Sequence, residues 1–256
     1  PAGAVGLEIV LSGPTLRFPC GGVVALTGAR FDGARDSGIP LTWNETLMLA
    51  PGEIIQLGRA ESGCRCWLAV RGGLVVPPVL GSGSTFLPSG FGGHAGRALR
   101  AGDSLAFGEA GGEVRLLRAP PPAVDPSAPL RVVAGPQVGQ FDDEGLAAFF
   151  GGAYQAGAAA DRRGLRLAGP RVTHTRMEFP SQGVLPGAIQ VPPDGQPIIL
   201  GWDGPVTGGY PVIAAVIAAD WPRLAQLKPG DWIRFETISA EAARTLSGER
   251  AIGEPG

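Results

Sequence analysis

The chain has 256 residues, of which 44% are hydrophobic and 17% charged, and its formal net charge is −2. This length and apolar content allow a sizeable core and favour two compact units over one. The charges are interspersed and form no basic stripe, so nucleic acid is excluded as an expected partner. The longest wholly apolar stretch, Val212 to Ala219, is far shorter than a membrane span, and no secretory signal opens the chain. We therefore expect a cytoplasmic protein with no membrane partner.

Glycine and proline are abundant, at 42 and 25 residues. In a chain this apolar, such a composition is typical of short strands joined by tight turns, so a mainly β fold is predicted. In chain order, apolar runs predict strands at 6–11, 23–27, 53–57, 65–70, 104–107, 114–117, 188–191, 197–200 and 232–235.

Only a few short helices are predicted, each beginning after a residue that can cap its N-terminus. Asp142 precedes a segment in which Leu146 and Phe149 share a face, Asp220 precedes a second helix, and Ser239 opens a C-terminal one. Five prolines within 119–129 cannot continue a helix or a sheet. We therefore divide the chain into a first subdomain at 1–118, a linker at 119–129 and a second subdomain at 130–256.

A turn followed by a strand occurs three times with similar sequence: PGEIIQL at 51–57, AGDSLAF at 101–107 and PGDWIRF at 229–235. In each copy a glycine and an acid make the turn, and alternate apolar residues then point to one side. A β-barrel on both sides of the linker would explain this recurrence.

Cysteine and lysine usage excludes several kinds of site. Cys20, Cys64 and Cys66 are an odd number in a long chain and do not indicate a disulfide framework, so a reducing compartment is expected. Cys64 and Cys66 fall on one side of a predicted strand, but the chain offers only two histidines to complete a zinc site, so buried cysteines and no metal are predicted. The only lysine, Lys228, lies in a turn and matches neither a P-loop nor a biotin carrier. We expect this chain to bind no cofactor itself.

Several long strings follow one another in an order known from a protein family. They are LTGA at 26–29, WLAVRGGLVV at 67–76, DRRGLRLAGP at 161–170, SQGVLPGAIQVPPDGQPI at 181–198 and TGGYP at 207–211. Over nearly the whole chain, they resemble the allophanate hydrolase subunit 2 family. This family includes the C subunit of 5-oxoprolinase, a Kip-type regulator of a sporulation kinase, and part of the carboxyltransferase domain of urea carboxylase.

The resemblance implies two cyclophilin-like β-barrel subdomains. It also implies two partners, a protein of the allophanate hydrolase subunit 1 type and a lactam-utilisation subunit, with ATP used by the partner subunits. Members of the family open with a further stretch before the first matching string, so the first subdomain is expected to be N-terminally incomplete. One departure from the commoner family pattern is Gln182, which stands where glutamate or another polar residue is often found.

Candidate catalytic residues lie at and before the TGGYP string. Gly208 and Gly209 allow backbone N–H groups to approach a carbonyl oxygen, and Asp203 is a nearby carboxylate that can accept a proton. With Thr207 and Tyr210 beside them, these residues are predicted to form a loop that binds an amide or a lactam. The alternative is a turn that needs glycine for its backbone conformation.

Four further residues are candidates for binding the substrate. The planar amides of Gln190 and Gln196 suit the donor and acceptor pair of a urea or a lactam. Arg162 and Arg166 are suited to hold a carboxylate such as that of 5-oxoproline. For each of the four, a purely structural role is an open alternative.

The leading hypothesis is an enzyme component that, with its partners, opens 5-oxoproline to glutamate at the expense of ATP. The second hypothesis is carboxyl transfer from carboxybiotin to a urea-like nitrogen, with biotin on a separate carrier. The third is a non-catalytic regulator that binds a kinase inhibitor.

Overall fold

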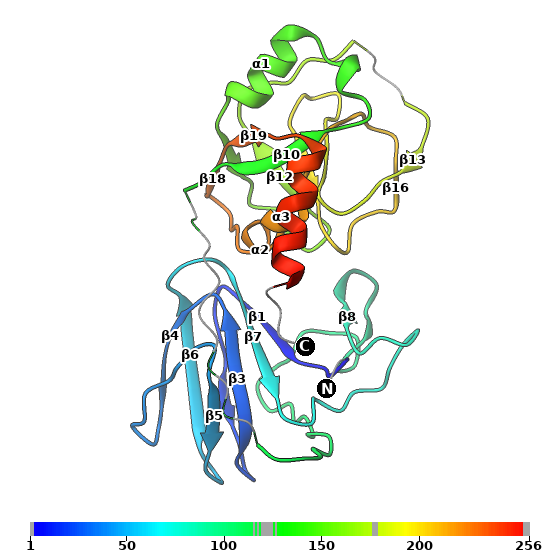
Figure 1. Ribbon diagram of the computed structural model, residues 1–256. Helices are drawn as coiled ribbons and strands as arrows, with labels where there is room; N and C mark the ends of the chain where they lie inside the picture. The colour runs from blue at the N-terminus through cyan, green and yellow to red at the C-terminus, as the bar shows by residue number, and fades with distance from the viewer. Residues whose placement is uncertain are drawn as a thin grey trace. The chain divides into compact units, whose positions relative to one another are not determined.

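The computed structural model describes residues 3–114, 116, 118, 125, 127–175 and 179–252, with 249–252 described by their backbone only. The chain divides into two compact units, Pro1–Ala123 and Val124–Gly256. Each unit is described by itself below (Figure 1). Most of the proline-rich segment 119–129 lies outside the described residues. None of the described helices is long and apolar enough to cross a membrane.

The first unit contains two antiparallel sheets. The larger sheet has, in spatial order, β1 (Leu7–Val10), β7 (Arg65–Val70), β3 (Gly22–Gly28) and β5 (Thr46–Leu49). The smaller sheet has the order β2 (Thr15–Arg17), β6 (Ile54–Ala60) and β4 (Phe31–Arg35). Their apolar faces share one core in which Leu26, Ile55 and Cys66 are fully buried. A short hairpin follows, formed by β8 (Thr85–Phe86), η1 (Leu87–Ser89) and β9 (Phe91–Gly92).

The second unit is built on one eight-stranded sheet. Its spatial order is β18 (Trp232–Ile233), β11 (Tyr154–Ala156), β12 (Gly164–Ala168), β15 (Ile198–Leu200), β14 (Ala188–Gln190), β17 (Val212–Val216), β10 (Leu130–Ala134) and β19 (Phe235–Thr237). The two edge strands follow each other in the chain, with only Arg234 between them, and the Arg234 carbonyl accepts a hydrogen bond from Leu130 N–H at 2.8 Å. Because one segment supplies both edges, the sheet curls into a nearly closed barrel.

Short helices cover the barrel rather than form a layer. On α1 (Asp143–Gly151), Phe149 stacks on Phe235 with ring centroids 4.5 Å apart. The hydroxyl of Tyr154 donates to the Ala148 carbonyl, and burial raises the Tyr154 pKa to about 12. The remaining elements are η2 (Val138–Gln140), η3 (Ala218–Asp220), α2 (Trp221–Leu224), α3 (Ala240–Ile252) and the two-stranded ribbon of β13 (Gln182–Gly183) and β16 (Thr207–Gly208).

The mainly β fold with a few short helices is confirmed. The predicted strand at 104–107 is wrong, because Phe107 makes only an isolated bridge with Leu74 and stays partly exposed. The strand predicted at 232–235 is interrupted at Arg234, where the chain crosses from one sheet edge to the other. The strand predicted at 114–117 lies partly outside the described residues.

Two of the three predicted helix caps are confirmed. Asp142 accepts the Gly145 N–H at 2.7 Å, and the Ser239 hydroxyl accepts the Ala242 N–H at 3.1 Å. The prediction that Asp220 caps α2 is wrong, since its side chain makes no cap hydrogen bond. Its carboxylate instead accepts the backbone N–H and the guanidinium of Arg131.

The recurring turn has one structure in all three copies. Its glycine has a left-handed backbone, with φ of +86° at Gly52 and +92° at both Gly102 and Gly230. The next residue is an acid whose carboxylate accepts the N–H three positions earlier: Ala50 to Glu53 at 2.8 Å, Arg100 to Asp103 at 2.7 Å and Lys228 to Asp231 at 3.0 Å. The acids of this repeat therefore hold turns closed.

The turn geometry predicts opposite effects for two glycine substitutions. Gly230→Ala should lower the free energy of unfolding by about 1 kcal/mol, because a Cβ at this φ is strained even though the space around it is open. Gly151→Ala, in helix α1 and equally open, should be neutral or slightly stabilising. Urea titration of both variants measures the difference, and equal stabilities would contradict the strain argument.

Candidate functional site

The TGGYP segment forms part of a β-ribbon in the second unit. Thr207 and Gly208 make up β16, which pairs with β13 so that Gln182 faces Gly208 and Gly183 faces Thr207. Figure 1 shows the two strands side by side. The prediction that Thr207 and Gly208 lie in a loop is therefore wrong. Strand pairing also places the side chain of Gln182 on the same face of the ribbon as the Cα hydrogen of Gly208 that a side chain would replace.

Gln190 lies beneath this ribbon at a β-bulge between β14 and β17. It is only 4% exposed, and its Nε2 donates to the Tyr210 carbonyl at 3.4 Å. A Cβ built on Gly208 would lie 2.5 Å from that same Nε2. A Cβ at 208 would displace the end of the Gln190 side chain, so glycine lets the amide keep this position, and three of the predicted residues, Gln190, Gly208 and Tyr210, meet in one place.

Two more glutamines are hydrogen-bonded to each other nearby, starting from the backbone two residues after Tyr210. The Val212 N–H donates to Gln137 Oε1 at 3.0 Å, and Gln137 Nε2 donates to Gln182 Oε1 at 2.8 Å. The Nε2 of Gln182 is buried and, among the described residues, has no hydrogen-bond partner. We call Gln137, Gln182 and Gln190 the glutamine cluster. Gln137 and Gln182 were not predicted as site residues, because three amides from distant segments leave no spacing pattern in the sequence.

Asp203, the predicted base, forms a salt bridge with Arg162, one of the two arginines predicted to hold a carboxylate. Arg162 Nε lies 2.6 Å from Asp203 Oδ2, and the Asp203 N–H donates to the Arg162 carbonyl at 3.0 Å. The side chains are 42% and 26% exposed, respectively. Within the described residues, the carboxylate of Asp203 makes no hydrogen bond or ion pair with the glutamine cluster. Its position supports a salt bridge at the end of the paired strands β12 and β15.

Arg166 and Gln196 are not brought to the glutamine cluster by any described contact. Arg166 lies on the outward face of β12, whose Leu165 and Leu167 face the core. The amide of Gln196 is bound on both sides by the backbone of Gly169, at 2.9 Å from the N–H and 3.3 Å from the carbonyl. A Cβ built on Gly209, the second glycine of TGGYP, would lie 3.3 Å from the Phe179 carbonyl oxygen. For Gln196 the structure thus supports the structural alternative.

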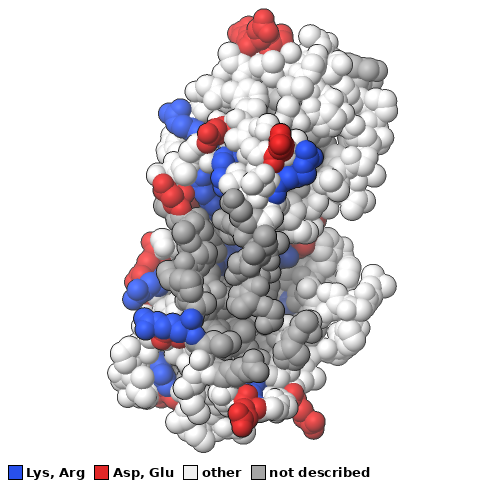
Figure 2. Space-filling model, in the orientation of Figure 1, with Lys and Arg blue, Asp and Glu red and all other residues white. Residues whose placement is uncertain are grey.

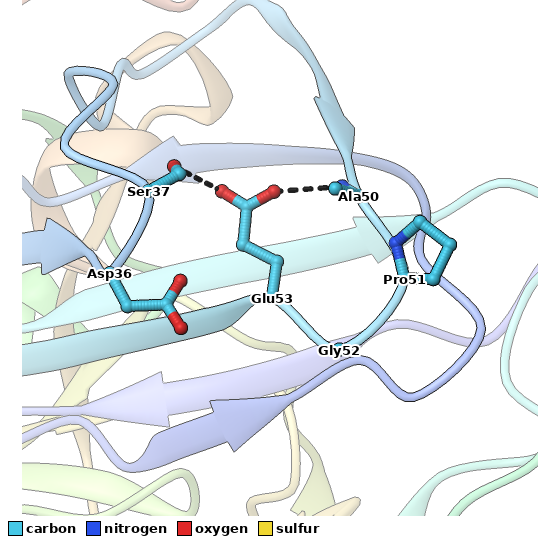
Figure 3. Close-up of a pocket in the computed structure, with 6 residues that line it drawn as sticks. All are labelled: Asp36, Ser37, Ala50, Pro51, Gly52 and Glu53. Atoms are coloured by element: carbon cyan, nitrogen blue, oxygen red, sulfur yellow. Dashed lines mark hydrogen bonds between the residues drawn. The ribbon is translucent and has the colours of Figure 1, made fainter.

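A separate recess of about 340 Å³ lies in the first unit and is drawn in Figure 3. It is formed by Asp36, Ser37 and the turn residues 50–53. The Glu53 carboxylate points into this recess but accepts hydrogen bonds from Ser37 Oγ at 2.7 Å and Ala50 N–H at 2.8 Å. Arg35 Nε, also buried, lies 2.6 Å away from it. The described hydrogen bonds of Glu53 all stabilise a strand or a turn. We therefore assign this carboxylate a structural role.

This buried pair gives the first unit a pH-dependent stability. Hydrogen bonds to its carboxylate lower the pKa of Glu53 from 4.5 to about 2. The bond from the Arg35 guanidinium has the larger effect and the bond from the Ser37 hydroxyl the smaller. A carboxyl whose folded pKa is depressed stabilises the fold above its unfolded pKa. This stabilisation should therefore be present at pH 7 and disappear as the pH falls from about 4.5 to about 2.

Glu53→Gln should lower the free energy of unfolding at pH 7 by about 3 kcal/mol, since it leaves the buried Arg35 without its counter-charge. The difference from the unsubstituted chain should shrink below pH 4.5. Glu61→Gln removes an exposed pair with Arg30 and should cost below about 1 kcal/mol at any pH. Denaturant titrations at several pH values check this, and a pH-independent Glu53→Gln effect would contradict the role of this carboxylate.

The positions of two cysteines and both histidines are consistent with structural roles. Cys64 and Cys66 are buried, as predicted, and burial raises the pKa of the Cys66 thiol. His174 packs its edge against Phe141, and His94 lies 3.6 Å from Asp103. Over the described part of the chain, no group of three or more His, Cys, Asp or Glu is placed to hold a metal ion. On the face drawn in Figure 2, basic and acidic side chains are intermixed.

Residues 1–237 match the model of the carboxyltransferase domain, subdomain A and B. The chain belongs to this family. It is 40% identical to the C subunit of 5-oxoprolinase from Escherichia coli, and this match covers 94% of the present chain and 78% of the relative. The glutamine cluster and the TGGYP ribbon therefore lie in a carboxyltransferase-type domain.

Two further comparisons link the chain to urea-processing enzymes. It is 32% identical to urea amidolyase of Saccharomyces cerevisiae over 94% of its own length, which is 14% of that protein. The solved structure of the K. lactis urea amidolyase superposes with a TM-score of 0.83 at 30% identity, covering 98% of the present chain and 17% of that chain. The predicted family and fold are confirmed, while the chain corresponds to only a small part of these large enzymes.

Proposed function

We propose that this chain is the carboxyltransferase-like subunit of an ATP-dependent 5-oxoprolinase, which hydrolyses the lactam of 5-oxoproline to glutamate. The observation that carries the proposal is the 40% identity to the C subunit of the Escherichia coli 5-oxoprolinase across most of both chains. The name of that relative designates one subunit of an enzyme. The proposal therefore includes partners, a protein of the allophanate hydrolase subunit 1 type and a lactam-utilisation subunit.

The chemistry of the chain fits a division of labour in which the partners use ATP. Its only lysine, Lys228, donates from Nζ to Asp231 at 2.8 Å within a turn, which supports a structural role for the one side chain that a P-loop would require. The glutamine cluster is neutral, with Gln190 buried and Gln137 and Gln182 half-buried, which suits a neutral amide substrate better than a phosphate. This chain would bind and orient the lactam while other subunits activate it.

The geometry shifts the expected roles of the predicted residues. A base must accept a proton in a site the substrate can reach, and Asp203 already has its carboxylate bound by Arg162. We therefore place substrate recognition at Gln190, Gly208 and the ribbon they support. The Asp203 and Arg162 pair would hold the adjoining ends of strands β12 and β15 together.

Carboxyl transfer to a urea-like nitrogen, with biotin on a separate carrier, is the second candidate. The observation that favours it is the close superposition with the K. lactis urea amidolyase, at a TM-score of 0.83. Urea and a lactam share a planar carbonyl beside an N–H, so one site chemistry serves both candidates. Dependence on biotin and bicarbonate separates them.

A coupled assay tests the proposal. The chain is combined with the partner subunits encoded beside it and supplied with 5-oxoproline and ATP, while glutamate and ADP are followed. We expect glutamate and ADP to form together only when all subunits are present, because the chain supplies binding groups and not ATP chemistry.

Two glutamine variants, one at the proposed site and one control, extend this assay. Gln190→Ala should reduce kcat/KM by about tenfold or more, because it removes a buried amide beside the proposed substrate. Gln155→Ala, at an exposed position of β11, should leave it unchanged. Turnover of urea with bicarbonate and a biotinylated carrier, without turnover of 5-oxoproline, would replace this proposal by the second candidate.

A further inference from the structure

We propose that Gln182 and Gln190 form a donor and acceptor pair that recognises the –C(=O)–NH– group of a lactam, and that Gln137 is a positioning residue that sets the polarity of this pair. The inference deepens the proposed function and rests on it for the identity of the ligand. Its physical basis is the direction of the hydrogen bonds in the glutamine cluster.

The backbone fixes the orientation of Gln137 and Gln182. A backbone N–H can only donate, so the side-chain atom of Gln137 that faces the Val212 N–H must be the oxygen. The amide nitrogen of Gln137 then faces Gln182, and the atom of Gln182 that receives its hydrogen bond must be the oxygen. The nitrogen of Gln182 is left over. This buried atom is a donor without a partner among the described residues.

The orientation of Gln190 is fixed in the opposite sense. A backbone carbonyl can only accept, so the atom of Gln190 that faces the Tyr210 carbonyl must be the nitrogen. The oxygen of Gln190 is then the free end of its amide, and within the part of the chain that the structure describes it receives no hydrogen bond. The cluster therefore offers one donor and one acceptor.

Strand pairing places the two free ends on one side of the ribbon. Gln182 and Gly208 are direct partners in the antiparallel β13 and β16 pair, so their side-chain directions point to the same face. The Cβ direction of Gly208 leads to the Gln190 amide, 2.5 Å from its nitrogen and 3.3 Å from its oxygen. The side chains of Gln182 and Gln190 consequently lie on the same face of the ribbon.

A lactam matches this pair because its ring holds the carbonyl and the N–H side by side. The carbonyl oxygen accepts from Gln182 Nε2, and the ring N–H donates to Gln190 Oε1. Leaving the buried Gln182 nitrogen unpaired costs about 1–3 kcal/mol, so a ligand that accepts its hydrogen bond removes that cost. An N-methyl lactam lacks the donor and should be rejected.

Binding to the full chain tests this inference independently of turnover. Saturation-transfer NMR titrations compare 5-oxoproline with N-methyl-5-oxoproline. The unsubstituted chain should bind the lactam about tenfold or more tightly than its N-methyl analogue. Gln182→Glu keeps the oxygen that Gln137 binds but removes the free donor, so lactam affinity should fall by about tenfold or more.

Gln137→Glu tests the positioning role. A glutamate at 137 accepts from Val212 N–H but cannot donate to Gln182, so the Gln182 amide should turn and present its oxygen to the ligand. Lactam affinity should then fall as in Gln182→Glu although Gln182 is intact. Gln155→Glu, the same chemical change on an exposed residue of β11, should bind as the unsubstituted chain does.

Equal affinity for the two ligands, or undiminished lactam binding by Gln182→Glu, would overturn the inference, as would the absence of lactam binding by the unsubstituted chain. The binding result and the turnover result are separable. If the assembled complex makes no glutamate while the chain still discriminates between lactam and N-methyl lactam, the proposed function fails and the donor and acceptor pair stands.

Discussion

One backbone hydrogen bond, from Val212 N–H to the side chain of Gln137, fixes the orientation of two amides in the proposed lactam site. The β-bulge at Ile189 and Gln190 shifts the register of β14 against β17 at this point. The side chain of Gln137 then receives the Val212 N–H. Because the donor belongs to the main chain, its direction cannot change without unfolding the strand. The polarity of Gln137 and then of Gln182 follows from it, so a fold-level irregularity sets the chemistry of the cluster.

The neutrality of the cluster is a second consequence. Burying a charge without a partner is far more costly than burying a hydrogen-bonded amide, and several acids of the chain have structural roles elsewhere. Glu53, Asp103 and Asp231 each close a turn by accepting a backbone N–H. Asp220 ties the β10 strand to the start of α2 through Arg131. Carboxylates thus hold the scaffold together, and uncharged amides remain available for a neutral ligand.

Much of the fold could be predicted because local sequence encodes it. The turn glycines, the strand at 65–70 and the caps at Asp142 and Ser239 each depend on neighbouring residues. The closure of the second barrel could not be predicted in the same way, because the break at Arg234 depends on two sheet edges meeting. Asp220 has the sequence context of a cap, but its partner Arg131 lies 89 positions away.

The site could be predicted only in part for the same reason. The family resemblance points to Gly208 and Gln190, and the structure brings them together. Gln137 and Gln182 escape sequence reasoning because the hydrogen bond between them joins segments 45 positions apart. Asp203 and Arg162 have separate roles in the sequence-based hypothesis, yet they neutralise each other in the structure. Spacing along the chain cannot reveal which polar side chains satisfy one another.

Comparing lactam binding by Gly208→Ala and Gly183→Ala tests whether recognition takes place at the glutamine cluster. These glycines belong to two successive residue pairs of the ribbon, but a Cβ at 208 meets the Gln190 amide at 2.5 Å, whereas a Cβ at 183 meets nothing within 4 Å. Gly208→Ala should lose lactam binding by about tenfold or more and shift the NMR signals of the Gln190 side-chain amide, while Gly183→Ala should change neither. If Gly208→Ala binds the lactam as the unsubstituted chain does, recognition does not take place at the glutamine cluster.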